Sequence, residues 1–317
     1  MARKHVPKFD SVLGLSGNTP LVGVHQLSPN PEVKIWAKLE GQNPGGSSKD
    51  RIALKMIEMA EEDGVLTPGA TILEPSSGNT GIGLALVAKL RGYKLRVVMP
   101  ENVSIERRQL LEIFGAEVTT SPGEEGSNGA IRMAEKIAAD SPEYVFLFQY
   151  GNPANPLAHY EATGPEILRD CPEVDVFVAG LGTSGTLMGV GKYLKQRQPH
   201  VRVVAVEPPA GEFVQGLRNL DDGFVPPIFD PEVLDRKLIV RPRESVEWTR
   251  RLLDECGVFS GISSGAAMAG AAKAAEQMDS GTIVTLFPDG GWKYLSSGAW
   301  TDPLDEVVER ATRINYW

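Results

Sequence analysis

The sequence predicts an α/β fold built on two mostly parallel sheets. Short apolar runs rich in β-branched residues alternate with amphipathic segments of helical period along most of the chain. These runs are apolar on both faces, as strands are when helices cover both sides of a parallel sheet. The strand–helix alternation implies right-handed crossovers. So many predicted strands in 317 residues favour two sheets rather than one.

Most of the predicted strands are followed by a segment of helical period. We predict strands at residues 71–73, 95–99, 117–119, 145–148, 176–179, 203–206 and 282–287. We predict helices at residues 51–62, 81–90, 104–114, 128–139, 185–196, 246–255 and 266–278. In the first helix Ile52, Met56 and Ile57 share one face. The third should end before Gly115, because glycine readily adopts the left-handed conformation that closes a helix.

The composition excludes several classes of protein. A net charge of −9 argues against nucleic-acid or anionic-membrane partners, because both need a basic face. The charged N-terminus lacks a following apolar run, and no stretch approaches the ~18 apolar residues of a membrane span. Cys171 and Cys256 have no metal-site spacing, so we expect neither a disulfide nor a metal site. We expect a cytoplasmic protein.

A glycine-rich turn within residues 43–51 leads into the first predicted helix and places Lys49 in its first turn. A cation there opposes the helix dipole, which costs up to ~1 kcal/mol. Neutralising the lysine as an imine with an aldehyde would remove that conflict. The alternative is an ordinary solvated lysine whose charge Asp50 offsets. The spacing of a phosphate-binding P-loop is absent.

Residues 74–81 form a hydroxyl-rich glycine turn between a predicted strand and a predicted helix. Backbone N–H groups, the hydroxyls of Ser77 and Thr80, and the helix dipole could together bind a carboxylate. The alternative is a plain helix cap. Three hydroxyls and an asparagine within residues 76–80 exceed what capping alone requires.

Residues 180–186 form a second glycine-rich turn that would suit a phosphate, again between strand and helix. Gly180, Gly182 and Gly185 also match the dinucleotide-binding pattern, and Glu207 lies where that pattern expects an acid. A dinucleotide site therefore stays open on this segment alone. A lysine behind a glycine turn and a second anion loop are not features that a dinucleotide fold requires.

Together these segments resemble the fold-type II pyridoxal-phosphate enzymes that perform β-replacement, and within them the cysteine synthases. The resemblance spans nearly the whole chain, with matching segments in family order at residues 17–22, 43–51, 74–81, 148–155, 180–186 and 261–267. It implies two three-layer α/β domains with the active site between them. We expect a smaller mobile domain at residues 41–148, and a larger domain at 149–317 that also includes about 11–40.

The resemblance also implies a role for each matching residue. Lys49 would be the catalytic lysine that carries the cofactor as an imine, Asn79 would bind the cofactor's ring hydroxyl, and Ser263 would meet its pyridine nitrogen. The cofactor phosphate would be bound by Gly182, Thr183, Ser184, Gly185 and Thr186. The substrate carboxylate would be bound by Ser76, Ser77, Thr80 and Gln149.

The chemistry of Ser263 agrees with β-replacement. In many such sites an acidic partner keeps the pyridine nitrogen protonated. A neutral serine does this poorly, so the ring is a weaker electron sink and early loss of a β-leaving group is favoured. Lys49, once released, can remove the proton at Cα. The implied course runs through an enzyme-bound α-aminoacrylate, to which a sulfur nucleophile adds.

The irregular stretch at residues 208–242 bears on the leaving group, because long irregular segments are often binding loops. Residues 212–226 resemble the cysteine synthase B branch, which uses O-phospho-L-serine, and so do residues 291–296. The resemblance places Arg218 at the substrate phosphate, and a guanidinium suits that task because its planar fork can chelate phosphate. The alternative is that Arg218 pairs with Asp221 or Asp222 on the surface.

The same branch implies partners. Its sulfur donor is a small carrier protein with a C-terminal thiocarboxylate, with sulfide as the alternative, and its members are homodimers. Its C-terminal tail can fold over the mouth of the active site, which is a hypothesis here for residues 313–317.

Three other functions are compatible with parts of the sequence. The first is an O-acetylserine sulfhydrylase, or a cystathionine β-synthase-like enzyme that uses serine; Arg218 has no evident purpose with an uncharged hydroxyl. The second is a non-catalytic protein of the same fold, against which the joint presence of Lys49, Asn79 and Ser263 argues. The third is a nicotinamide dehydrogenase.

Overall fold

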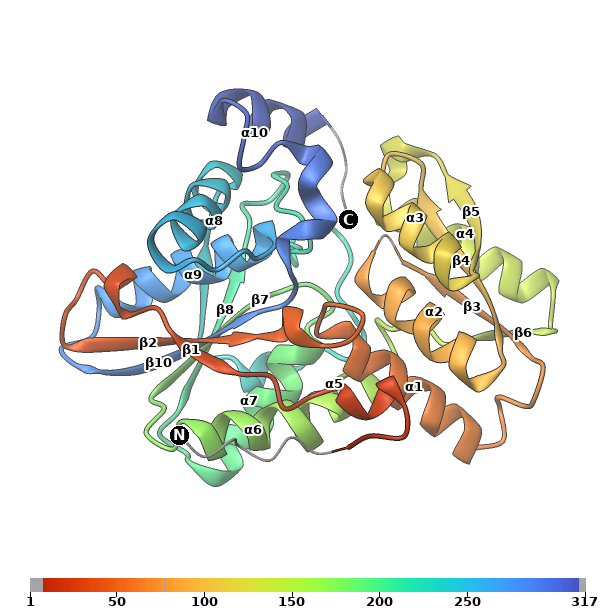
Figure 1. Ribbon diagram of the computed structural model, residues 1–317, viewed down its shortest axis with the longest axis horizontal. Helices are drawn as coiled ribbons and strands as arrows, with labels where there is room; N and C mark the ends of the chain where they lie inside the picture. The colour runs from red at the N-terminus through yellow and green to blue at the C-terminus, as the bar shows by residue number, and fades with distance from the viewer. Residues whose placement is uncertain (1–7, 77, 314–317) are drawn as a thin grey trace.

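A computed structural model describes residues 8–76 and 78–313, and Figure 1 shows its two sheets. Within these residues the larger sheet has six strands, in the order β1 (Leu21–Gly23), β2 (Val33–Leu39), β10 (Gly281–Phe287), β7 (Val176–Gly180), β8 (Arg202–Glu207) and β9 (Arg236–Ile239). The smaller sheet has four, in the order β5 (Glu117–Ser121), β4 (Lys94–Pro100), β3 (Thr71–Pro75) and β6 (Tyr144–Phe146). β1 and β2 pair antiparallel, and the other pairings in this part of the chain are parallel. The predicted α/β class with mostly parallel sheets is confirmed.

Helices cover both sheets. Those near the smaller sheet are α1 (Lys49–Glu62), α2 (Asn79–Arg91), α3 (Ile105–Phe114) and α4 (Gly126–Asp140) (Figure 1). Those near the larger sheet are α5 (Ala154–Ala158), α6 (Gly164–Asp170), α7 (Gly185–Arg197), α8 (Pro242–Cys256), α9 (Ile262–Ala275) and α10 (Leu304–Arg313). Gly115 ends α3 in the left-handed conformation, with φ 91°, as the sequence predicted. In the described part of the chain, no helix combines the length and apolar character that crossing a membrane requires.

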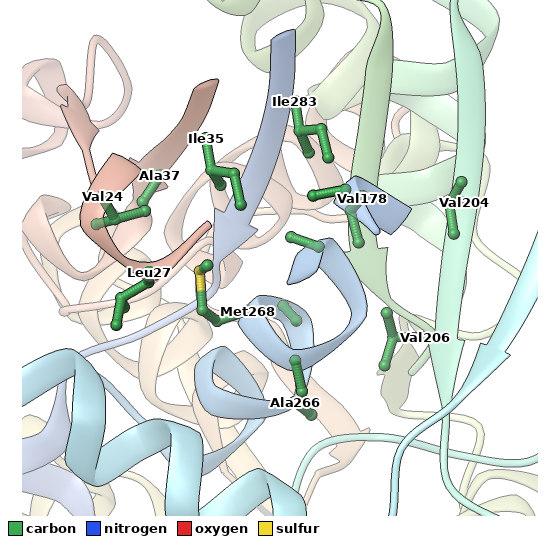
Figure 2. Close-up of a cluster of buried hydrophobic side chains, with 14 of the residues drawn as sticks. Val24, Leu27, Ile35, Ala37, Val178, Val204, Val206, Ala266, Met268 and Ile283 are labelled. Carbon is green, nitrogen blue, oxygen red and sulfur yellow. The ribbon is translucent and has the colours of Figure 1, made fainter. Parts of the chain in front are cut away.

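The core of the larger half is organised around α9. This helix is rich in alanine and glycine, so it approaches both the sheet and α8 closely. A Cβ on Gly270 would lie 2.3 Å from Val206, and one on Gly265 would lie 2.1 Å from the carbonyl oxygen of Ser245. Figure 2 shows Ala266 and Met268 of α9 among valine and isoleucine side chains of the strands. The start of α9, which carries Ser263, is therefore fixed against the larger sheet.

Buried ion pairs join α1 to the larger half. The Arg51 guanidinium contacts Glu40 and Glu166, each at 2.7 Å, and Lys38 contacts Glu166 at 2.7 Å. None of these side chains is more than 7% exposed. Glu40 follows β2 and Glu166 belongs to α6, whereas Arg51 lies two residues after Lys49. The cluster therefore holds the helix that bears Lys49 against the larger sheet.

The predicted strands and helices agree with the structure to within a few residues, with one correction at a strand end. The strand predicted at 145–148 stops at Phe146, because the chain turns sharply and Phe148 takes a positive φ of 52°. The four-stranded sheet lies within the segment 41–148, whose mobility as a domain stays a prediction. Residues 314–317 of the hypothesised tail lie outside the described residues.

Candidate active site

A cavity of about 1030 Å³, counting the part open to solvent, lies between the two sheets. Its wall includes residues that follow the carboxyl ends of β3, β7 and β10, where parallel sheets commonly bind ligands. Of the residues predicted from the sequence, it brings together Lys49, Ser76, Asn79, Thr80, Gln149, Gly182, Thr183, Ser184, Thr186, Arg218 and Ser263. Gly185 is not in this wall but begins α7 beside it. Ser77 lies outside the described residues.

Lys49 is the first residue of α1, in the first turn as predicted, and lines the cavity. The turn before it is held by the Ser48 N–H, which donates to the Pro288 carbonyl at 2.8 Å. The Lys49 Nζ lies 3.4 Å from the Ser48 hydroxyl. Burial lowers the pKa of Lys49, and the negative charges of Asp289 and Glu40 oppose that shift. A lysine with a lowered pKa is suited to imine formation and to accepting a proton.

The turn before α2 presents hydroxyl groups to the cavity. The Ser76 hydroxyl accepts hydrogen bonds from the N–H groups of Gly78, at 3.3 Å, and Gly81, at 2.9 Å. Its own proton therefore remains available to donate. The Thr80 hydroxyl donates to the Gln149 side-chain oxygen at 2.6 Å, which joins the start of α2 to the segment after β6. The Ser76 hydroxyl, at the N-terminal end of α2, is therefore a donor of the kind that a carboxylate binds.

Glu74 lies buried behind this turn and was not singled out from the sequence. Its Oε1 accepts from the Gln149 N–H at 3.1 Å, and its Oε2 has no hydrogen-bond partner within residues 8–76 and 78–313. Burial raises the pKa of Glu74 to about 8, against a weaker opposing effect of hydrogen bonds from Gln149 and Phe148. The group is therefore protonated at neutral pH in the folded protein.

Substituting Glu74→Gln should change how stability depends on pH. The unfolded chain ionises this group near pH 4.5, whereas the folded one keeps its proton to about pH 8, so wild-type stability falls as pH rises between these values. Glutamine cannot ionise, and we expect the variant to be more stable at pH 8 by ~2–4 kcal/mol and nearly equal at pH 4.5. Urea unfolding at both pH values measures this difference. Parallel pH profiles for the two proteins would contradict it.

The loop between β7 and α7 fits a phosphate group. Ser184 takes a positive φ of 70°, which is strained for a serine, and its buried hydroxyl has no hydrogen-bond partner in the described part of the chain. A Cβ on Gly182 would lie 2.8 Å from the Gly216 carbonyl oxygen, so only glycine fits there. The Thr183 hydroxyl accepts from the Asn155 amide at 3.0 Å. A strained loop with an unsatisfied donor at a helix N-terminus is a suitable cradle for the cofactor phosphate.

His159 supports this loop from behind and was missed in the sequence. Its ring nitrogens lie 2.9 Å from the Thr163 hydroxyl and 3.2 Å from the Thr186 hydroxyl. Burial, followed by the charge of Lys49, lowers the pKa of His159 to about 3, so the ring is neutral. It lies in a π-helix, His159–Thr163, a distortion that is frequent at functional sites. Nothing in the local spacing of these residues distinguishes the π-helix from an ordinary helical turn.

Ser263 lies at the start of α9 and faces the cavity beside Gly216. Of the described residues that line the cavity, Lys49, Arg107 and Arg218 are basic and none is Asp or Glu. The electrostatic character of this wall is thus opposite to the chain's net charge of −9. A basic wall of this kind favours an anionic ligand.

Arg218 lies inside the protein rather than on its surface. Its side chain is 5% exposed, and its guanidinium lies over the rings of Tyr150, at 5.4 Å, and Phe224, at 4.6 Å. Ser127, at the start of α4, lines the same region of the cavity. Neither Tyr150 nor Ser127 was predicted, because each belongs to a segment distant in sequence from Arg218.

Comparison with known proteins decides the family. The model of the family described as "Pyridoxal-phosphate dependent enzyme" matches residues 12–289 of this chain. The chain belongs to this family. Its members use pyridoxal phosphate, and the residues described above fit that cofactor. Glu207, which a dinucleotide site would have used, instead pairs with Lys237 at 2.8 Å.

Relatives within the family are cysteine synthases and similar enzymes. A cysteine synthase from Staphylococcus aureus is 44% identical over 94% of this chain and 98% of its own. A crystal structure of O-ureido-L-serine synthase matches with a TM-score of 0.87 and 40% identity, over 93% of this chain and 96% of the other. The cysteine synthase of Entamoeba histolytica matches with a TM-score of 0.87 and 32% identity, over 99% and 97%. The fold-type II class is confirmed, and the chain is an enzyme of the cysteine synthase family.

Proposed function

We propose that this enzyme makes L-cysteine, or a cysteine adduct, by β-replacement on O-phospho-L-serine. The observation that carries the proposal is the cavity wall. It combines a carboxylate-binding turn at Ser76 and Thr80 with a buried arginine, Arg218, and contains no acid among its described residues. O-Phosphoserine carries two anionic groups, a carboxylate and a phosphate, and these two parts of the wall could bind one each.

Arg218 is suited to phosphate because its position is constrained. Stacking against Tyr150 and Phe224 limits the rotamers of the side chain, so little additional entropy is lost when the guanidinium binds an anion. A buried guanidinium also interacts more strongly with an anion than an exposed one does. Tyr150 and Ser127 supply hydroxyls in the same region.

Each predicted site residue then has a defined task. Pyridoxal phosphate, when bound at Lys49, supplies an electron-withdrawing ring that makes the substrate's Cα proton acidic. Lys49 removes that proton and returns it after sulfur has been added, which its lowered pKa favours. Asn79 binds the ring hydroxyl and Ser263 the pyridine nitrogen. The phosphate group of the cofactor, as distinct from that of the substrate, is bound by Gly182, Thr183, Ser184, Gly185 and Thr186.

Substrate binding would involve closure of the smaller half. Ser76, Ser77, Thr80 and Gln149 bind the substrate carboxylate. Within the predicted mobile domain at residues 41–148, the smaller sheet and its turns move towards the larger half. Closure of this kind excludes water from the reacting atoms. The Thr80–Gln149 hydrogen bond holds the two carboxylate-binding segments together during the motion.

The substrate proposal is tested by Arg218→Ala. We expect the variant to lose at least ~100-fold in kcat/KM with O-phosphoserine, because a charge-assisted bidentate contact is removed. With O-acetylserine the change should be less than about threefold, because that substrate has no phosphate. Cysteine formation from each substrate, with sulfide as the common donor, measures the ratio.

Arg218→Lys is the matched control, since it keeps the positive charge but lacks the paired N–H donors of the guanidinium. It should restore part of the phosphoserine rate. Equal losses with both substrates would show that Arg218 serves the fold of the site and not the phosphate. A wild-type enzyme that prefers O-acetylserine would overturn the phosphoserine proposal itself.

O-Acetylserine sulfhydrylase is the second candidate function. An enzyme of that name from Entamoeba histolytica is 35% identical to this chain over 98% of each chain, with a TM-score of 0.86. The basic wall with Arg218 is what favours phosphoserine over it. For the donor we propose a small thiocarboxylated carrier protein, with sulfide as the alternative, and for the enzyme a cytoplasmic homodimer.

A further inference from the structure

The side chain of Asn79 is held by two buried charged residues that come from the other end of the chain. The Lys293 ammonium donates to the Asn79 oxygen at 2.8 Å, and the Asn79 amide nitrogen donates to Asp289 at 2.8 Å. Asn79 starts α2 beside the smaller sheet, whereas Asp289 and Lys293 follow β10 of the larger one. Residues more than 200 positions apart in sequence therefore meet at this amide.

These contacts determine which way the amide faces. An ammonium can only donate, and an ionised carboxylate can only accept. The Asn79 oxygen must therefore face Lys293, and one N–H must face Asp289. The second N–H of the same nitrogen is the part of the amide that remains for a ligand in the cavity, whose wall includes Asn79.

The two charged residues are themselves held firmly. Asp289 is 2% exposed and also accepts from the Tyr294 hydroxyl, while its carbonyl oxygen accepts from the Gly261 N–H at 3.1 Å. Lys293 is 1% exposed and also donates to the Gly46 carbonyl at 3.2 Å. Burying two charges carries a large desolvation cost, and a hydrophobic pair would fill this space at less cost. This desolvation cost indicates that Asp289 and Lys293 do more than fill space in the core.

We propose that Asp289 and Lys293 are positioning residues that fix the orientation of the Asn79 amide, so that it presents an N–H to the ring oxygen of the cofactor. This inference rests on the proposed role of Asn79. Neither residue is among the described residues that line the cavity, and both act through the amide. Through that N–H they would set the proton affinity of the imine nitrogen at Lys49.

Other charged groups surround the lysines and must be counted in any pH experiment. Glu40 and Asp289 face Lys49. Asp50, Arg107, Asp289 and Lys49 face Lys293. A substitution at 289 or 293 could therefore act directly on Lys49 through its charge, and the experiment has to separate that route from the one through Asn79.

A double-mutant cycle separates the two routes. The protein is loaded with pyridoxal phosphate, and its visible absorption is titrated with pH in the absence of substrate. Lys293→Met and Asp289→Asn are each made in the wild-type protein and in an Asn79→Ala background. We expect each to shift the titration midpoint by about one pH unit or more in the wild type, and by less than half as much without the Asn79 amide. Lys293→Arg should restore the wild-type midpoint.

Equal shifts in both backgrounds, or no shift in either, would overturn the inference, since they would show that the amide transmits nothing. Lys195→Met, which breaks an exposed ion pair with Asp235, is the control substitution and should leave the midpoint unchanged. Circular dichroism establishes that each variant is folded. If Lys293→Met fails to fold, the Asp289→Asn cycle decides alone. A wild-type protein without a visible band would instead refute the role of Lys49.

Discussion

Replacing Lys49 with alanine is expected to lower the rate of β-replacement by at least ~10³-fold. The variant loses both the amine that links the cofactor and the base that moves the Cα proton. Both tasks need a neutral amine in the cavity, and burial favours that form by lowering the pKa of Lys49. Cysteine formation under single-turnover conditions measures the loss, and the visible spectrum of the loaded protein should lose its Lys49-dependent band.

Two controls make the result specific. Lys195→Ala removes a lysine from an exposed ion pair with Asp235 and should leave the rate within about twofold of wild type. Added methylamine or a similar small amine should restore part of the Lys49→Ala activity by replacing the missing base. A variant that keeps more than a tenth of the wild-type rate would exclude Lys49 as the catalytic lysine.

The second large effect concerns stability. Arg51→Met should lower the free energy of unfolding by ~3–5 kcal/mol at pH 7, because it leaves Glu40 and Glu166 buried without their shared cation. Urea unfolding followed by circular dichroism measures the change. Arg91→Met, which breaks exposed pairs with Glu58 and Glu61, is the matched control and should cost no more than ~1 kcal/mol.

The same loss should depend on pH. Burial disfavours the charged carboxylates, but Arg51, together with Lys38 at Glu166, outweighs it. The pKa of Glu166 falls to about 2, and that of Glu40 is also lowered. Lowered carboxyl pKa values contribute stability above about pH 4.5, and that contribution is lost as pH falls towards 2. The difference between wild type and Arg51→Met should therefore shrink between pH 7 and pH 3. A constant difference would show that lost packing, and not charge, causes the destabilisation.

Much of the fold could be predicted because its central strands are apolar on both faces. β3, β4, β7, β8 and β10 are of this kind, and all were predicted. β2 was missed because Lys34 and Lys38 interrupt its apolar run. Lys38 is nevertheless buried, since Glu166 neutralises it, and no local pattern reveals a partner so far along the chain. β9 was missed for a similar reason, because it is short and begins with two basic residues.

The candidate site divides in the same way. The loops that bear Lys49, Asn79, Gly182 and Ser263 are continuous motifs, so these site residues could be predicted from the sequence. Asp289 and Lys293 act on Asn79 from a distant segment, and His159 acts on Thr186 through a π-helix. Such pairings arise only when the two sheets come together. Predicting them would have required knowledge of spatial contacts between segments.

The buried cluster around Arg51 has a consequence for how the enzyme opens. Although Lys49 and α1 lie inside the segment 41–148, Arg51 ties that helix to Glu40 and Glu166 of the larger half. Moving α1 away from the larger half would break these ion pairs and leave buried charges without partners. We therefore expect α1 to act as part of the stationary base, with the pivot on its C-terminal side, before β3. The catalytic amine would then stay still while the carboxylate-binding turn swings over it.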